Sequence, residues 1–180
     1  LGGALGVLPT SSQSEAWLLR LGVADGATVW ANTLSEAVAT DVVIDLGLTD
    51  DGTILALGRE SDTVLWAVSP AGEVLWKQPA IDPRGGSVAV GKDGSFAFTG
   101  GLTLPIDDPN ACVAGDGLCP VAMQIARHNA DRSPRWAATR EECRVGIVAA
   151  VTPGDGILVL AGCSETGLGD AVMGLMLFAP

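Results

Sequence analysis

The four cysteines are the residues whose spacing indicates a specific chemistry most directly. They are Cys112, Cys119, Cys143 and Cys163, with no Cys-x-x-Cys pair among them. The chain has a single histidine, so this spacing favours disulfides over a zinc site. Of the three pairings that four cysteines allow, we predict Cys112–Cys119 within one loop and Cys143–Cys163 across a hairpin whose ends antiparallel pairing brings close. Free thiols in a reducing cytosol are the alternative.

A short acidic segment is the next group that could do chemistry. Asp107, Asp108, Asn110 and Asp116 carry oxygen atoms of the kind that Ca²⁺ prefers. Cys112, however, stands where the calcium-loop pattern needs an oxygen ligand. We therefore predict a solvated loop rather than a metal site.

The remaining polar residues form no recognisable catalytic pattern. His128 lies in HNAD, a sequence typical of a hairpin turn, and we predict a histidine on the surface. No GxSxG, HExxH or phosphate-binding loop occurs. The sequence thus predicts no catalytic residue, no cofactor-binding residue, no metal ligand and no cofactor, which favours a protein that is not an enzyme.

An internal repeat must position these residues. Three stretches align without gaps, and each begins with Asp-Gly and ends at a Gly six residues after the first: DGTILALG (51–58), DGSFAFTG (93–100) and DGILVLAG (155–162). Asp-Gly before an apolar run is a hairpin signal, because Gly tolerates positive φ. Each copy therefore predicts strand, turn and strand, with Gly52, Gly94 and Gly156 as repeat glycines.

A second hairpin alternates with the first. The segments 17–34, 66–80 and 123–139 each run from apolar residues through a turn to a tryptophan. We call Trp30, Trp76 and Trp136 the closing tryptophans; the opening residues of the same segments are Trp17, Trp66 and Met123. Two hairpins per copy predict a unit of four short strands in about 40–45 residues.

This unit matches the blade of a β-propeller. We predict an all-β chain in which residues 1–180 form a β-propeller repeat region, a partial ring of four-stranded antiparallel blades. It would hold about three full blades plus partial blades at both ends. A longer connector between two hairpins predicts an inserted loop at about 103–120, on one rim. Because both ends fall in mid-blade, we expect a piece of a longer chain or an assembly that covers the end faces.

Composition excludes several classes of protein. Hydrophobic residues make up 48% of the chain and charged residues 17%, which argues against disorder. A net charge of −11 without any basic cluster argues against nucleic acid and anionic membrane surfaces as partners. No apolar run approaches the ~20 residues of a transmembrane helix, so no membrane insertion is expected.

The repeat resembles bacterial propeller repeats of the PQQ-like and SBBP-like kind over nearly the whole chain. The residues that carry the resemblance are AGEVLWK (71–77), the Asp-Gly hairpins and the Gly after each second strand. Quinoprotein dehydrogenases share a Gly-x-x-x-Trp docking motif, which stands here as Gly26-Ala-Thr-Val-Trp30 and Gly72-Glu-Val-Leu-Trp76; the third copy lacks the Gly. The resemblance implies the fold and does not carry cofactor binding across.

Three functions are consistent with this reading. We expect a non-catalytic extracytoplasmic β-propeller that acts as an interaction or scaffold module, with a protein or glycan ligand at a propeller rim. The disulfides favour a periplasmic, secreted or lipid-anchored cell-surface location. One alternative is part of a PQQ-dependent quinoprotein-type oxidoreductase. The other is a carbohydrate-binding or carbohydrate-active propeller, a class whose active members use paired carboxylates.

Overall fold

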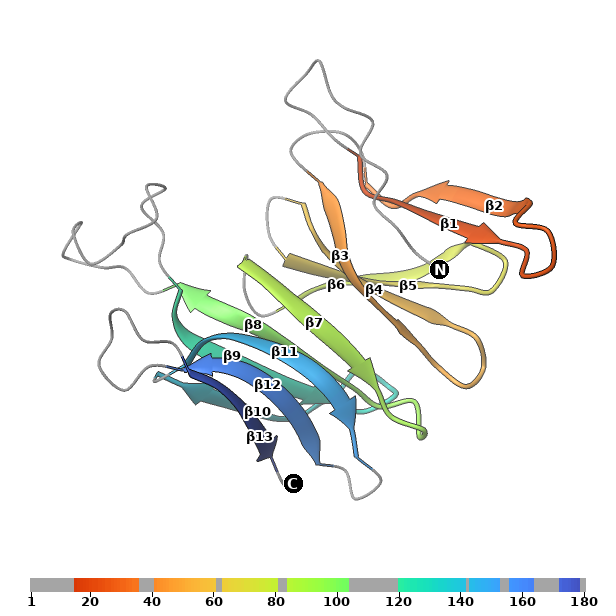
Figure 1. The fold of residues 1–180 in the computed structure, drawn as a ribbon. Helices are drawn as coiled ribbons and strands as arrows, with labels where there is room; N and C mark the ends of the chain where they lie inside the picture. The colour runs from red at the N-terminus through yellow and green to blue at the C-terminus, as the bar shows by residue number, and fades with distance from the viewer. Residues whose placement is uncertain are drawn as a thin grey trace, which may run out of the picture. The chain divides into compact units, whose positions relative to one another are not determined.

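The computed structural model describes residues 15–35, 41–60, 63–80, 84–103, 120–141, 143–152, 156–163 and 172–178. These residues form thirteen β-strands and no helix, which confirms the predicted all-β class (Figure 1). Within this part of the chain there is accordingly no apolar helix long enough to cross a bilayer. The chain divides into two compact units, Leu1–Ala80 and Ile81–Pro180, and each is described by itself.

The first unit contains a two-stranded and a four-stranded antiparallel sheet. The two-stranded sheet pairs β1 (Trp17–Leu21) with β2 (Thr28–Thr33). The four-stranded sheet follows chain order, with β3 (Val42–Leu48), β4 (Ile54–Arg59), β5 (Thr63–Val68) and β6 (Val74–Pro79). Neighbouring strands in the chain are neighbours in the sheet, as two consecutive hairpins per copy predicted.

The second unit repeats this arrangement. Its four-stranded antiparallel sheet holds β7 (Arg84–Val90), β8 (Phe96–Thr103), β9 (Pro120–His128) and β10 (Pro134–Arg140) in order. A three-stranded sheet follows, with β11 (Cys143–Val151), β12 (Ile157–Cys163) and β13 (Val172–Phe178). The predicted inserted loop falls between β8 and β9, and residues 104–119 lie outside the described residues.

One turn geometry recurs at the hairpins. After β3, the Thr49 N–H donates to the Thr53 carbonyl at 2.9 Å, and the Gly52 N–H donates to the Thr49 carbonyl at 3.0 Å. These bonds define a three-residue loop that ends in a left-handed residue. Gly52 has a φ of 85° and Gly94 a φ of 78°, angles that glycine adopts without steric cost.

The copy at Gly156 differs by one position. The Thr152 N–H donates to the Gly156 carbonyl at 2.7 Å, the bond that Thr49 makes with Thr53 in the first copy. Gly156 therefore stands at the place of Thr53 rather than that of Gly52, and its φ lies outside the left-handed region. The gapless alignment is thus one residue out of phase here, because the hydrogen bonds of the turn set the register of the strands.

Sheet register also decides which tryptophans are equivalent. Each closing tryptophan pairs with the same position of its partner strand, next to a register irregularity: Trp30 with Arg20, Trp76 with Ala67 and Trp136 with Arg127. The opening residues do not share a position. Trp66 lies two residues before the last residue of β5, whereas Met123 lies five residues before the last residue of β9.

In the first unit, the core lies between the two sheets. Leu18 of β1 packs with Ala56, Trp66 and Val68 of the four-stranded sheet. Trp66 is fully buried, and Gly58 makes room for it: a Cβ at Gly58 would lie 2.7 Å from the Trp66 ring and 2.3 Å from the Val42 carbonyl oxygen. Gly58, the residue before the last of β4, is therefore required by close packing.

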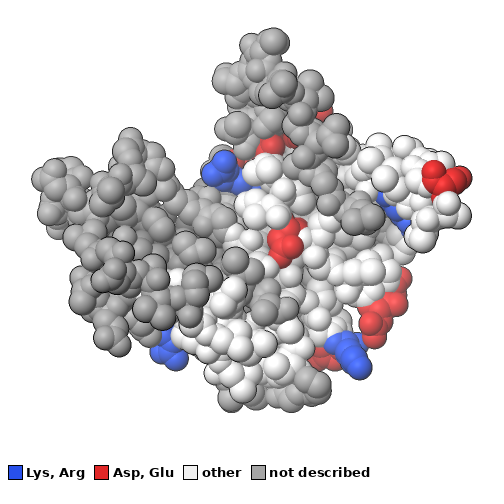
Figure 2. Space-filling view, viewed as in Figure 1, with Lys and Arg blue, Asp and Glu red and all other residues white. Residues whose placement is uncertain are grey.

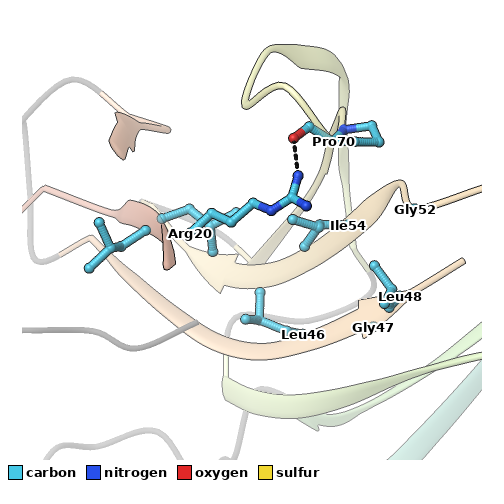
Figure 3. Close-up of a pocket in the computed structure, with 9 residues that line it drawn as sticks. Arg20, Leu46, Gly47, Leu48, Gly52, Ile54 and Pro70 are labelled. Atoms are coloured by element: carbon cyan, nitrogen blue, oxygen red, sulfur yellow. Dashed lines mark hydrogen bonds between the residues drawn. The ribbon is translucent and has the colours of Figure 1, made fainter. Parts of the chain in front are cut away.

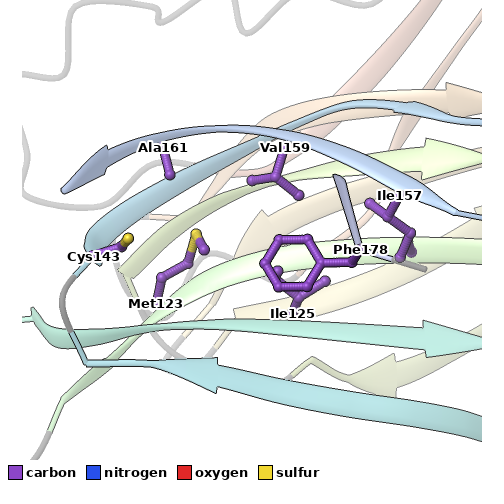
Figure 4. Packing of buried hydrophobic residues seen from close by; sticks show 8 residues of the cluster. Met123, Ile125, Cys143, Ile157, Val159, Ala161 and Phe178 are labelled. Carbon is purple, nitrogen blue, oxygen red and sulfur yellow. The ribbon is translucent and has the colours of Figure 1, made fainter. Parts of the chain in front are cut away.

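In the second unit, two sheets pack face to face (Figure 4). Ala97, Met123 and Ile125 come from the four-stranded sheet, and the residues that meet them from the three-stranded sheet are Cys143, Ile157, Val159, Ala161 and Phe178. All eight side chains are at most 8% exposed. Burial along β12 alternates: Ile157 and Val159 are buried in this core, whereas the two leucines of ILVL are half-buried on the other face.

Candidate functional site

A disulfide joins Cys143 of β11 to Cys163 of β12. The two residues are register partners across the hairpin, with Cα atoms 4.0 Å apart. Hairpin pairing therefore brings together the cysteines that the sequence predicted. The other predicted pair, Cys112 and Cys119, lies outside the described residues.

The sequence suggested that His128 lies in a turn, but it is the last residue of β9. Its ring stacks on Phe96 and Phe98 of β8, with centroids 5.2 and 5.1 Å apart. Burial lowers the pKa of His128 from its ordinary 6.5, and Nδ1 is buried without a hydrogen-bond partner in the described structure. The imidazole is thus part of an aromatic stack and is held in its neutral form.

The aspartates described at the turns have structural roles. Hydrogen bonds from the Thr49 hydroxyl, the Ser95 hydroxyl and the Ser133 hydroxyl lower the pKa values of Asp51, Asp93 and Asp131 respectively. These bonds tie each carboxylate to its own hairpin. In the described ranges no group of three His, Cys, Asp or Glu side chains could hold a metal ion. Asp107, Asp108, Asn110 and Asp116 lie outside them.

A side chain from one sheet docks on a turn of the next in the first unit. The Trp30 Nε1–H donates to the Pro70 carbonyl at 3.0 Å, and the Asn32 amide donates to the Gly72 carbonyl at 2.6 Å. The Trp30 ring covers Gly72 so closely that a Cβ there would lie 2.8 Å from Trp30 Cδ2. Glycine is thus required at position 72 for two reasons: its φ of 93° is left-handed, and the Trp30 ring leaves no room for a Cβ.

The equivalent tryptophan of the second unit has a different neighbour. Trp136 stacks on Phe178 of β13 with centroids 6.5 Å apart, and the Arg140 guanidinium lies 5.3 Å from the same ring. The Trp136 Nε1 is buried and has no acceptor among the described residues. A closing tryptophan therefore lies at a contact between two sheets in both units.

A groove of about 530 Å³ opens beside β1 in the first unit (Figure 3). Its lining comes from β1, from β3, the β3–β4 turn and the start of β4, and from the β5–β6 turn: Leu18, Leu19, Arg20, Leu46, Gly47, Leu48, Gly52, Ile54 and Pro70. Ligand pockets of this size are usually apolar with a few placed polar groups. We take this groove as the candidate site.

Arg20 is the charged residue of this lining. Its Nη1 donates to the Pro70 carbonyl at 2.6 Å, which holds the guanidinium at the end of the groove (Figure 3). The other lining side chains are leucine, isoleucine, proline or glycine. The groove can therefore bind apolar groups and one anion, and its lining includes no residue able to act as a general base or nucleophile.

Sequence reasoning did not identify this groove. It singled out cysteines, aspartates and tryptophans, whereas the groove is built from leucines of β1 and β3 and from Arg20. The signal present in the sequence is that Arg20 interrupts the apolar run 17–23, six residues before the hairpin glycine Gly26. Acidic and basic side chains are sparse and dispersed on the described surface seen in Figure 2, as the sequence predicted.

No protein-family model matches the chain, and no curated protein matches it. Among solved structures, a protein of unknown function from Bacteroides caccae is similar over 77% of this chain and 44% of its own, with 15% identity and a TM-score of 0.48. A mutant of Synechocystis apocarotenoid oxygenase is similar over 86% of this chain and 36% of its own, with 17% identity and a TM-score of 0.46. The chain thus spans less than half the length of either structure.

Proposed function

We propose that the chain is a β-propeller repeat region that serves as a non-catalytic interaction or scaffold module outside the cytoplasm. The observation that carries this proposal is the docking of Trp30 on the Pro70–Gly72 turn. That contact joins the edge hairpin of one sheet to the edge hairpin of the next through a hydrogen bond and a half-buried ring that covers Gly72. Stacking of this kind favours a rigid array of sheets, which can present loops and strand edges to a partner.

Exposed apolar side chains support the interaction role. In the first unit Val29 is 56% exposed, Leu48 66% and Leu75 52%. Isolated apolar residues at a surface are common, but these lie on strands at sheet edges, where added chains can pair. The Cys143–Cys163 disulfide supports the proposed location, because such bonds persist in oxidising compartments.

The two alternatives have narrower support. A quinoprotein-type oxidoreductase is favoured only by the Gly-x-x-x-Trp resemblance, and Trp30 and Gly72 serve here in packing one sheet on another. A carbohydrate-active propeller would present paired carboxylates, and the aspartates described at Asp51, Asp93 and Asp131 are tied to their turns.

The test combines a chemical and a cellular measurement. Purified protein is incubated with PQQ and Ca²⁺, dialysed and examined for quinone absorbance and dye reduction. In the native host, a photo-crosslinking residue replaces Leu75, and excess unlabelled protein serves as competitor.

We expect no retained chromophore, and a crosslinked adduct that the competitor removes. A stoichiometric quinone with turnover would establish the oxidoreductase instead. The absence of any competed adduct at Leu75 would contradict the interaction role.

A further inference from the structure

Strand register aligns the three-stranded sheet of the second unit with the four-stranded sheet of the first. Ile54 pairs with Val68 across β4 and β5. Ile157 pairs with Phe178 across β12 and β13. Ile54 and Ile157 each come directly after the residue whose carbonyl closes the preceding hairpin turn. β12 therefore aligns with β4, and β13 with β5, residue for residue.

Four leucines lie on one face of the three-stranded sheet, and we call them the leucine face. They form two cross-strand pairs, Leu158 with Leu177 and Leu160 with Leu175. Leu175 and Leu177 are each 65% exposed, and Leu158 and Leu160 are half-buried. Neither β12 nor β13 contains a charged residue. The leucine face is therefore an apolar surface built on strands that pair with each other along their length.

The aligned positions of the first unit are buried. Each of them is at most 2% exposed, and they are Leu55, Leu57, Leu65 and Ala67. The same register positions are thus covered in one sheet and open in the other. Because an apolar sheet face in water costs free energy, the leucine face marks an interaction surface.

The stacking of sheets within each unit shows which kind of surface covers such a face. In the second unit, Ile125 of β9 holds the place of Leu175 and packs in one core with Val159 of the following sheet. In the first unit, Leu18 of β1 holds the same place and packs in one core with Ala56 of the following sheet. Val159 and Ala56 are aligned with each other, on the opposite face of their sheets. The leucine face therefore corresponds to the side of a sheet that receives the opposite face of another sheet.

Among the described sheets, that of β1 and β2 presents such an opposite face in exposed form. Side chains alternate along β1, so Leu19 and Leu21 point away from the core that holds Leu18. Leu21 is 36% exposed and Leu19 is half-buried. In the other three sheets the residues of this face are buried, as shown by Ala56, Phe98 and Val159.

We propose that the leucine face docks on the β1–β2 sheet of a second copy of this chain, against Leu19 and Leu21. This head-to-tail contact repeats between copies the stacking that each unit shows within itself, and its two sides are different surfaces. A second copy is the partner because the chain itself carries the matching face. This inference rests on the proposed interaction function and gives that function a surface and a partner.

Sedimentation velocity of the full chain over about a hundredfold range of concentration tests the inference. The wild type is expected to self-associate as its concentration rises. Leu175→Lys with Leu177→Lys removes the leucine face, and Leu21→Lys removes the opposite face. Each variant is expected to associate at least about tenfold more weakly, because an ammonium group in an apolar contact loses its water.

An equimolar mixture of the two variants tests the orientation of the contact. One variant keeps an intact β1–β2 sheet and the other keeps an intact leucine face, so the mixture is expected to form a one-to-one complex that neither variant forms alone. Pairing of two leucine faces would leave the mixture monomeric.

Leu75→Lys is the matched control, because Leu75 is 52% exposed on β6, in a sheet outside the proposed contact. It is expected to associate as the wild type does. At concentrations where the wild type is monomeric, the double variant should unfold within a few degrees of Leu75→Lys. A clearly lower melting temperature would show that the same chain covers the leucines, and would overturn the proposal.

Three further results would overturn it. They are a wild type that stays monomeric over the whole range, a double variant that associates as the wild type does, and a mixture of variants that stays monomeric. Crosslinking at Leu75 tests the interaction function separately. A competed adduct at Leu75 together with a monomeric wild type would therefore reject the contact between copies and leave the proposed function standing.

Discussion

Arg132→Gly is expected to stabilise the second unit. Arg132 has a φ of 73° and stands in the β9–β10 turn where the β5–β6 turn has Gly72, with the Arg132 N–H donating to the Asn129 carbonyl at 2.9 Å. A non-glycine residue in left-handed geometry costs about 1–2 kcal/mol, because its Cβ crowds the backbone. Glycine removes this cost. It also gives the unfolded chain more conformational entropy, which lowers stability by about 0.5–1 kcal/mol. The net expected gain is about 0.5–1 kcal/mol.

Thermal and urea unfolding followed by circular dichroism measure this gain. For a unit of this size, a gain of this order raises the melting temperature by roughly 2–6 °C. Arg132→Ala is the control, because it removes the Arg132 side chain and its charge and keeps a non-glycine residue in the left-handed geometry. A melting temperature that rises equally in Arg132→Ala, or that does not rise in Arg132→Gly, would refute the assignment of strain to the backbone.

Three further predictions follow from the packing. Gly72→Ala should lower the melting temperature of the first unit by several degrees, because the new Cβ would lie 2.8 Å from the Trp30 ring; an unchanged value would contradict the docking contact. Cys143→Ser with Cys163→Ser should cost about 2–4 kcal/mol in urea unfolding, given a separation of 20 residues, and reduction of the wild type should give the same loss if the bond is responsible. Burial lowers the pKa of His128 in the folded chain, so the unfolded chain binds the proton more readily. Stability from this residue is present above about pH 6.5 and should fall as the pH drops below it; His128→Phe should flatten that part of the curve, and an unchanged slope would speak against the buried neutral imidazole.

Local signals in the sequence predicted the strands and most turns correctly. Asp-Gly at 51–52 and 93–94 marks turns because a left-handed residue is a local requirement that glycine meets at little cost. The closing tryptophans share one register position because each follows its hairpin turn at a nearly constant distance. Pairing within one hairpin likewise brought Cys143 to Cys163.

Other features depend on contacts that no local pattern records. The one-residue shift at Gly156 is set by turn hydrogen bonds, and Arg132 takes a left-handed angle because the strands on either side impose it. His128 stacks on Phe96 and Phe98 only once β8 and β9 pair.

The groove shows most clearly what tertiary structure adds. Arg20 and Pro70 are 50 residues apart in the chain, and their hydrogen bond forms only when one sheet stacks on the next. Leu48 reads in the sequence as one more apolar strand residue, yet it remains 66% exposed beside β1. Sequence alone therefore determined the hairpins, whose residues are close along the chain. Packing between sheets decided where the groove lies, because its lining is made of residues that only the folded chain brings together.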